Sequence, residues 1–263
     1  MAKRYAMEVE TEKQKKMILK AGINKGFTFL FFLIVFSSSY AQISSGRIVY
    51  ERRTNLQKRM GDNPRMKNFI NEQNKYRNEK FELFFNDSMC VFRPIEDEDP
   101  SAQGWMRYMT TRNTVYQNIN SREKCIILDL WGTEAILNDT MNKRRWKITD
   151  SKRNIAGYQC RRAIWQPNDT TRLYAWFTTE IVPSVGPEGF EGLPGTILGM
   201  ATEDGSVVYF AKEVKAMTPP AGVLNYNIKS KEIYTEEKLK EMLMGRMGQW
   251  LKPGDLDAMF LWL

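Results

Sequence analysis

The sequence contains no histidine among its 263 residues, and this absence excludes several classes of enzyme. Ser-His-Asp triads, Cys-His dyads, HExxH zinc sites and histidine proton shuttles all require the imidazole ring. The patterns GxSxG, CxxC and GxxxxGK[ST] are also missing, which removes three further catalytic or phosphate-binding motifs. Any catalysis would therefore depend on carboxylates, lysine, tyrosine, serine, threonine or a lone cysteine, and we expect no metal and no cofactor.

Cysteine is scarce, with three residues at Cys90, Cys125 and Cys160. In an oxidising compartment they allow one disulfide, by any of three pairings, with one free thiol left over. Three buried free thiols are an equal alternative, because a chain of this length builds a core without covalent cross-links. The spacing of the cysteines does not choose between these alternatives.

Long apolar runs are also absent, apart from the ten uncharged residues Phe27–Phe36, which follow several lysines. Ser39 and Ala41 then place small residues at positions −3 and −1 of a cleavage site before Gln42. A membrane-spanning helix needs about 20 residues, so this run is too short to be one. We predict that residues 1–41, starting at Met1 or Met17, are a secretory signal peptide. Residues 42–263 are then a single exported domain that does not span a membrane, in the periplasm, at the outer membrane or outside the cell.

The positive charge of the chain is partly that of its leader. Residues 1–41 hold seven of the 39 basic and three of the 31 acidic side chains, so residues 42–263 keep a net charge of +4. So small an excess in an exported protein does not favour nucleic acid as a partner.

Alternation of apolar and polar residues predicts an antiparallel sheet. In EKFELFF, for example, Phe81, Leu83 and Phe85 share one face. Turn signals such as Asp204-Gly205 separate the segments. The fold class we predict is mainly β (α+β), a curved antiparallel sheet or partly open barrel covered by a C-terminal helix. The predicted strands are 46–53, 79–85, 87–95, 113–119, 124–132, 134–139, 144–150, 158–166, 171–179 and 206–217.

Two segments are predicted to be helical. Asn63-Pro64 is typical of a helix start, and a short apolar stripe follows it. Thr235 is an N-cap candidate for a second helix, which Pro253-Gly254 would end. Leu239, Leu243 and further apolar residues recur there at helical spacing, so we expect one face of this helix to cover the sheet.

The stretch GPEGFEGLPGTILGM, residues 186–200, carries glycine at every third position near its start. Collagen needs many more such triplets, and a phosphate loop needs a following helix, whereas a predicted hairpin follows here. We predict a wide turn between strands in which Phe190 and Leu193 point inward. The alternative is that Glu188 and Glu191 face a ligand groove. The residues that mark this loop are Gly186, Pro187, Phe190, Gly192, Leu193, Pro194, Gly195 and Leu198.

Two blocks of the sequence carry a family resemblance. One is GLPGTIL (192–198), preceded by AWFTTEI, and the other is WKITDSKRNIAGYQCRRA (146–163). Together they resemble the GLPGLI family of secreted Bacteroidota proteins, with Thr196 where the family name has leucine. The resemblance covers most of residues 42–240. It implies an exported protein of unestablished role, encoded near outer-membrane receptors, with no catalytic residues to transfer. It also implies a module similar to the bowl-shaped N-terminal domain of a secreted peptide-N-glycosidase.

Basic side chains interleaved with aromatic ones are dense in residues 143–162. On adjacent strands they would form an anion-binding surface for lipid head groups, an acidic partner or an anionic glycan, or else only a solvated strand face. The four arginines selected for this patch are Arg144, Arg145, Arg161 and Arg162.

Three Asp-Ser/Thr-apolar triplets resemble the O-glycosylation sequence of Bacteroidota and lie at predicted turns, where a glycan fits. The acceptor residues would be Ser88, Thr140 and Thr170.

Three functional hypotheses follow for the exported domain. The favoured one is a non-enzymatic binding or accessory protein that holds an apolar or anionic ligand, or a partner segment, beside outer-membrane receptors. The second is a carboxylate-dependent hydrolase or an accessory domain of a carbohydrate-active enzyme, in which Glu180, Glu188 and Glu191 are the candidate carboxylates. The third is a subunit of an envelope complex, with its apolar C-terminus as the contact.

Overall fold

The computed structural model describes residues 7, 9–20, 42–60, 69–96, 110–130, 133–141, 144–226, 233–247, 256 and 260. The chain divides into two compact units, Met1–Ala41 and Gln42–Leu263. Residues 9–20 of the first unit are helical. Among the described residues, no helix has both the length and the hydropathy that crossing a bilayer requires. The boundary between the units falls at the predicted cleavage site, and the signal peptide itself stays a prediction.

The second unit is built on one sheet of twelve strands in the order β12-β6-β5-β4-β3-β2-β1-β11-β10-β9-β8-β7. Neighbouring strands are antiparallel, except that β12 runs parallel to β6. The predicted mainly β fold, an open sheet with a C-terminal helix, is confirmed. The strands are β1 (Gly46–Asn55), β2 (Tyr76–Phe85), β3 (Met89–Pro94), β4 (Thr114–Asn118), β5 (Glu123–Leu130), β6 (Thr133–Thr140), β7 (Trp146–Ile155), β8 (Tyr158–Trp165), β9 (Leu173–Thr178), β10 (Thr196–Thr202), β11 (Val207–Ala216) and β12 (Ile233–Tyr234).

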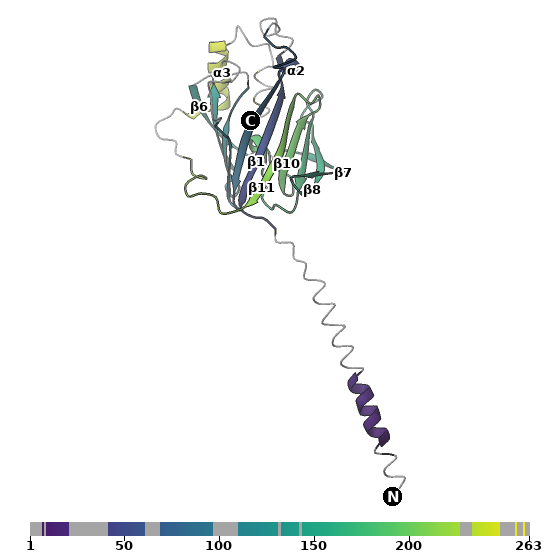
Figure 1. The fold of residues 1–263 in the computed structure, drawn as a ribbon. Coiled ribbons are helices and arrows are strands. Elements are labelled where there is room, and N and C mark those ends of the chain that lie inside the picture. The colour runs from purple at the N-terminus through teal and green to yellow at the C-terminus, as the bar shows by residue number, and fades with distance from the viewer. Residues whose placement is uncertain are drawn as a thin grey trace. The chain divides into compact units, whose positions relative to one another are not determined.

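Strand order and chain connectivity together require the sheet to curl. Ten strand-to-strand steps separate β6 from β7, yet β6 ends at Thr140 and β7 begins at Trp146. A flat sheet would hold the two strands roughly 48 Å apart, at about 4.8 Å per step. The connecting residues span at most about 20 Å, at about 3.5 Å each. The two sides of the sheet therefore approach each other, and Figure 1 shows the strands curving between β6 and β7.

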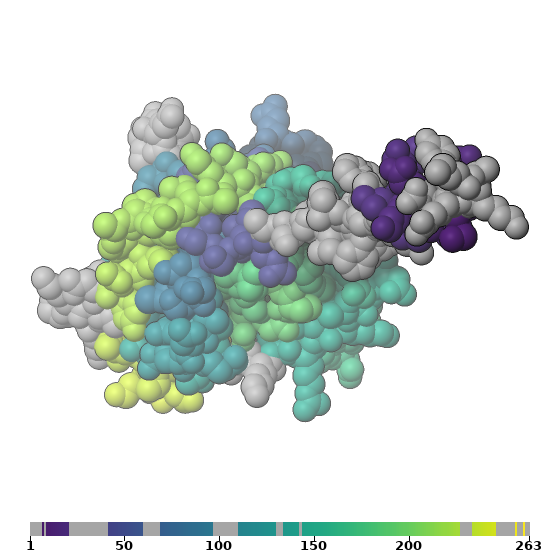
Figure 2. Space-filling view, turned by 90° about the horizontal axis from the view of Figure 1, so that it is seen from below, coloured from purple at the N-terminus to yellow at the C-terminus, as the bar shows by residue number. Residues whose placement is uncertain are grey.

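β1 is central although it comes first in sequence, because β2 and β11 pair with its two edges. In the view from below, residues near the start of β1 lie between those of β2 and the lime-green residues of β11 (Figure 2). The chain thus forms two runs of sequential antiparallel strands, β2 to β6 and β7 to β11, that meet at β1.

The inner face of the sheet carries the core. Alternate residues of β1, such as Ile48 and Tyr50, pair with Leu83 and Phe81 of β2 on this face. The Phe81 ring stacks on Phe92 with centroids 5.0 Å apart. Leu239 and Leu243 of α3 (Glu236–Met247) belong to the same cluster and are almost fully buried.

The ends of helices and hairpins follow the predicted signals. The Lys238 amide donates to Thr235 Oγ1 at 3.4 Å, so Thr235 caps α3. Gly205, between β10 and β11, has φ +68°, which the predicted Asp-Gly turn requires. The short helix α2 (Leu56–Met60) was not predicted, because five residues show no periodicity; Asn55 Oδ1 caps it by accepting from the Lys58 amide. The start of the helix predicted after Asn63-Pro64 lies outside the described residues, and Phe69 and Ile70, which belong to its predicted apolar stripe, are not helical. The end of the C-terminal helix also lies outside the described residues.

Candidate functional site

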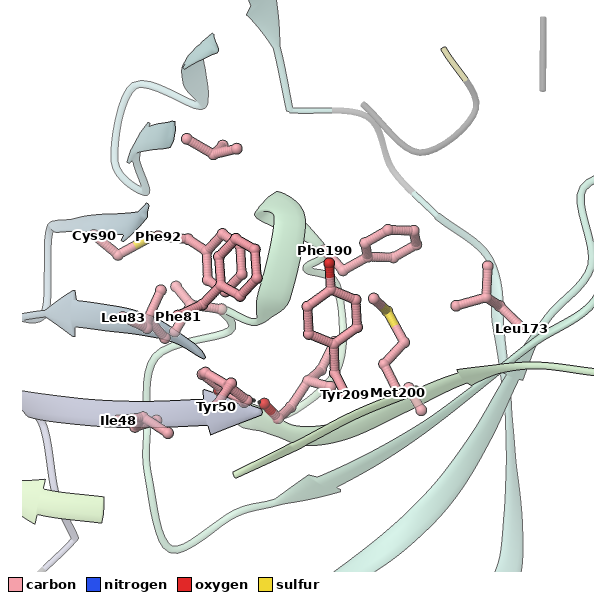
Figure 3. Packing of buried hydrophobic residues seen from close by; sticks show 14 of the residues in the cluster. Ile48, Tyr50, Phe81, Leu83, Cys90, Phe92, Leu173, Phe190, Met200 and Tyr209 are labelled. Carbon is pink, nitrogen blue, oxygen red and sulfur yellow. Dashed lines mark hydrogen bonds between the residues drawn. The ribbon is translucent and has the colours of Figure 1, made fainter. Parts of the chain in front are cut away.

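The motif-bearing loop between β9 and β10 lies inside the curved sheet. We call residues 183–195 the plug loop, because Phe190 and Leu193 are 0% and 2% exposed. Figure 3 shows the Phe190 ring beside Tyr209 and Met200, which come from the sheet. The η2 turn (Pro187–Gly189) contacts β3 and β4.

Hydrogen bonds tie the plug loop to opposite parts of the sheet. Gln117 Nε2 on β4 donates to the Gly189 carbonyl at 3.0 Å. Trp146 Nε1 at the start of β7 donates to the Glu191 carbonyl at 2.9 Å. Since β4 and β7 lie on different sides of the curved sheet, the loop joins these two sides.

Backbone geometry explains glycine at two places and exposes strain at a third. Gly195 has φ +137°, and a Cβ there would lie 2.0 Å from the carbonyl oxygen of Thr178. Gly189 has φ +73°, with Val115 2.9 Å from the position of a Cβ. Glu188 adopts the same left-handed region at φ +54° although it is not glycine. A non-glycine residue held there at a cost often marks a site where its side chain is needed.

The side chain of Glu188 joins a buried charge cluster around Arg52. Its Oε1 accepts a hydrogen bond from the Tyr209 hydroxyl and lies 3.5 Å from Nη1 of Arg52. Arg52 also binds Glu79, with Nη2 2.6 Å from Oε2, and its guanidinium lies 4.6 Å above the Phe81 ring. We call these residues and Arg77, whose Nε lies 3.0 Å from Glu79 Oε1, the Arg52 cluster.

The two carboxylates of the Arg52 cluster have pKa values shifted in opposite directions. Burial raises the pKa of Glu188, and although Arg52 and the Tyr209 hydroxyl each lower it, they do not outweigh the effect of burial. Burial also acts on Glu79, but the charges of Arg52 and Arg77 outweigh it and lower the pKa of Glu79. Glu79 is therefore the firmly ionised partner of Arg52, and Glu188 is the carboxyl that protonates more readily.

Glu191 belongs to a second buried cluster. Its carboxylate is 4% exposed and lies 3.5 Å from Nη2 of Arg122. Burial raises the pKa of Glu191, against the charges of Arg122, Arg144 and Lys124. Lys124 is buried and lies 3.4 Å from Asp139. Glu188 and Glu191 thus face cations of the sheet and are both buried, and neither lies open to solvent.

A pocket of about 300 Å³ opens at the ends of β3 to β6. Its lining is mostly polar, and Arg112 in it lies 4.0 Å from Glu79 of the Arg52 cluster. A carrier for an apolar ligand would instead need a lining of phenylalanine, leucine, methionine and tryptophan, and the plug loop fills the inner side of the sheet. The lining residues are Pro94, Glu96, Arg112, Thr114, Ile127, Asp129 and Glu134.

The predicted four-arginine patch does not exist as one surface. Arg144 is half-buried over the Phe190 ring at 4.2 Å, on the inner side. Arg162 lies over Tyr174 at 5.6 Å, on the outer side. Arg145 and Arg161 are exposed. Adjacent strand residues point to opposite faces, and a register irregularity between β7 and β8 separates them further.

The three cysteines are buried free thiols, so the disulfide alternative is wrong. Strand pairing gives the reason for two of them. Cys90 pairs with Gln117, whereas Cys125 pairs with the next residue, Tyr116, so these cysteines lie on opposite faces of the sheet. Cys160 lies on β8, far from both in the strand order.

The predicted glycosylation acceptors lie at or near turns. Thr140 and Thr170 are exposed, and Ser88 is half-buried. The hydroxyl of Thr170 donates to Asn168 within its own turn at 3.0 Å. Their modification stays a prediction.

The sequence alone did not single out Arg52, Glu79 or Tyr209. Each sits at an inward position of an alternating strand, where the pattern led us to expect an apolar residue. Arginine and glutamate at the inward positions 52 and 79 were the available signal. Charged residues are rarely fully buried unless paired, so two inward charges on strands predicted to be neighbours would have indicated the ion pair.

The described residues gather no group of three histidine, cysteine, aspartate or glutamate side chains with the arrangement of a metal site. The chemistry available in the Arg52 cluster is that of a carboxyl of raised pKa beside an ionised carboxylate. Both are 4–5% exposed, so a substrate could not reach them in this conformation.

Comparisons with known proteins support the fold but give little about function. A family model described as a protein of unknown function (Porph_ging) matches residues 165–199, which include the whole plug loop. No curated protein matches the sequence.

Among solved structures, PNGF-II resembles the chain with a TM-score of 0.54 and 15% identity, over 78% of this chain and 34% of that protein. A second crystal form of PNGF-II gives a TM-score of 0.51, again at 15% identity, over 77% of this chain and 33% of that one. MucB in complex with MucA(peri) gives a TM-score of only 0.36 at 9% identity, over 72% of this chain and 57% of that one. The chain therefore spans about a third of the length of PNGF-II, and the likeness shows the fold alone.

Proposed function

We propose that residues 42–263 form an exported binding module of the cell envelope, not an enzyme. The observation that carries this proposal is the engagement of the buried carboxylates. Glu79 and Glu188 are both held by Arg52, and Glu191 lies beside Arg122. Carboxylates that hold the plug loop inside the sheet are not available to a substrate. A binding partner would therefore contact the outer surface or the edges of the sheet.

Export is supported by two features that are independent of each other. The sequence carries a charged segment, an apolar run and small residues before Gln42. The compact unit also begins at Gln42. The resemblance to GLPGLI proteins and the match to residues 165–199 agree with this proposal. We infer a place in the periplasm or at the outer membrane, beside receptor or complex proteins, with no role for nucleic acid.

The hydrolase alternative has one observation in its favour. Two carboxyls whose pKa values are pushed apart are the usual arrangement of a general acid and its partner, and Glu188 and Glu79 have this property. Catalysis would require the plug loop to move away and open the Arg52 cluster. The alternative therefore predicts an activity that Glu188→Gln abolishes without a loss of stability.

The test uses the full chain with a C-terminal affinity tag, expressed in the cell from which the sequence comes. We expect the tagged protein in the envelope fraction or the medium, with Gln42 as its first residue by N-terminal sequencing. Chemical cross-linking before purification should capture one recurrent envelope protein. A cytoplasmic protein that retains residues 1–41 would contradict export, and glycoside hydrolysis that Glu188→Gln abolishes would favour the enzyme.

A further inference from the structure

Arginine side chains on the outer face of the sheet stand on aromatic rings. This face holds the residues that alternate with the core positions of each strand. A guanidinium over a ring is attracted by its π electrons and is held in place at little cost in side-chain entropy. The contacts are Arg47 and Arg93 on Phe84 (5.7 and 5.6 Å), Arg53 on Tyr76 (5.3 Å), Arg162 on Tyr174 (5.6 Å), and Arg153 on Trp176 and Phe210 (5.4 and 5.0 Å).

These residues form one continuous surface, because strand register joins them in rows. Glu51, Phe210, Gly199, Trp176 and Arg162 are successive cross-strand partners on β1, β11, β10, β9 and β8. A Cβ at position 199 would lie 2.8 Å from the Phe210 ring. Glycine there lets the rings of Trp176 and Phe210 approach to 5.8 Å and support Arg153 above them.

This face, from β3 across to β7, concentrates the positive charge of the unit. Four lysines, Lys80, Lys147, Lys212 and Lys215, join the five arginines, and all four are exposed. Three carboxylates, Glu51, Glu82 and Glu213, lie among the nine cations, so the face carries +6. Residues 42–263 as a whole carry only +4, so the remainder of the unit is net negative.

We propose that this outer surface, which we call the arginine face, binds an acidic polysaccharide. The inference rests on the proposed binding function and names its ligand class. A flat bilayer would touch the convex side of a curled sheet only along a narrow strip, whereas a flexible polyanion can follow the curve. Of the large apolar side chains exposed in the described residues, only Tyr76 lies on this face, so it offers little to insert into lipid.

The test compares two triple variants that change net charge equally. Lys80→Gln, Arg53→Gln and Lys215→Gln remove exposed cations of the arginine face. The control removes exposed cations elsewhere, through Arg145→Gln, Arg161→Gln and Lys238→Gln. Affinity for a fluorescent oligogalacturonate is measured by anisotropy at several salt concentrations, with the full chain as purified from expressing cells. Thermal unfolding of all three proteins checks their folding, and labelled neutral dextran is the blank.

We expect the variant of the arginine face to lose roughly tenfold or more in affinity, because it removes three cations from the surface that the polyanion follows. The affinity of the control variant for the oligogalacturonate should stay within about twofold of that of the unaltered protein. Equal losses in both variants, or no binding by the unaltered protein, would overturn the proposal. Tighter binding to anionic lipid vesicles than to the oligogalacturonate, at equal charge and salt, would also overturn it. None of these results depends on where the protein resides, so they leave the export test unaffected.

Discussion

Replacing Arg52 by leucine tests how the plug loop is held. Arg52 is 4% exposed and is the cation shared by Glu79 and Glu188. Its loss removes the guanidinium beside Glu188 and leaves Glu79 with Arg77, 3.0 Å away, as its nearest cation. Breaking a buried pair from one side costs about 3–5 kcal/mol. The matched control is Arg47→Leu, since Arg47 pairs with Glu82 on the outer face and its side chain is 30% exposed. Glu82 keeps Arg93, 2.8 Å away, as a second partner, so the loss of Arg47 should cost only about 0–1 kcal/mol.

The loss of unfolding free energy caused by Arg52→Leu should depend on pH in a definite direction. Arg52 lowers the pKa of Glu79, so this interaction stabilises the fold above the ordinary value of 4.5 and is lost as pH falls through the lowered pKa. Glu188, whose pKa is raised, opposes folding as pH rises above 4.5, and more so without Arg52. Urea unfolding at pH 7 and below pH 4.5 measures both effects. The reasoning is refuted if Arg52→Leu costs no more than Arg47→Leu, or costs the same at both pH values.

Three further outcomes follow from the structure. Phe190→Ala should cost about 3–5 kcal/mol in urea unfolding, because it empties the centre of the plug loop. Gly195→Ala should cost at least about 1–3 kcal/mol from backbone strain, whereas Gly205→Ala, where a Cβ meets nothing within 4 Å, should cost less; a reversed order would contradict this geometry. The three thiols should resist labelling until the protein unfolds, since burial raises the pKa of Cys90 and Cys160 to about 12, and a reducing agent should leave the unfolding temperature unchanged.

Most of the strands could be predicted because they carry their own alternation, as Ile48 and Tyr50 do in β1, whereas β10 is buried at six of its seven positions and shows none. Their order could not, since nothing local in β1 indicates that β2 and β11 will take its two edges. The charge clusters were missed for the same reason. Arg52 meets Glu188 across 136 positions of sequence, and a pattern read in short windows does not report such pairs.

For the predicted arginine patch, closeness in sequence was mistaken for closeness in space. Its basic residues lie within one stretch, 143–162, but Arg144 points inward onto Phe190 whereas Arg162 points outward onto Tyr174. The surface on which charge gathers is assembled from strands far apart in the chain, with Arg47 and Arg153 as examples. The density of basic residues in the sequence therefore predicted a cationic surface supported by aromatic rings, but not which strands form it.

Amide hydrogen exchange of the plug loop, residues 183–195, tests the central claim, that this glycine-rich loop is an internal support and not a ligand-binding loop. The amides of Val185, Phe190 and Gly195 donate to the carbonyls of Pro183, Pro187 and Leu193, at 3.0, 3.0 and 2.8 Å. The account predicts that these amides exchange as slowly as those of β10, with or without oligogalacturonate. Fast exchange in the unliganded protein that becomes slow when the ligand binds would contradict it.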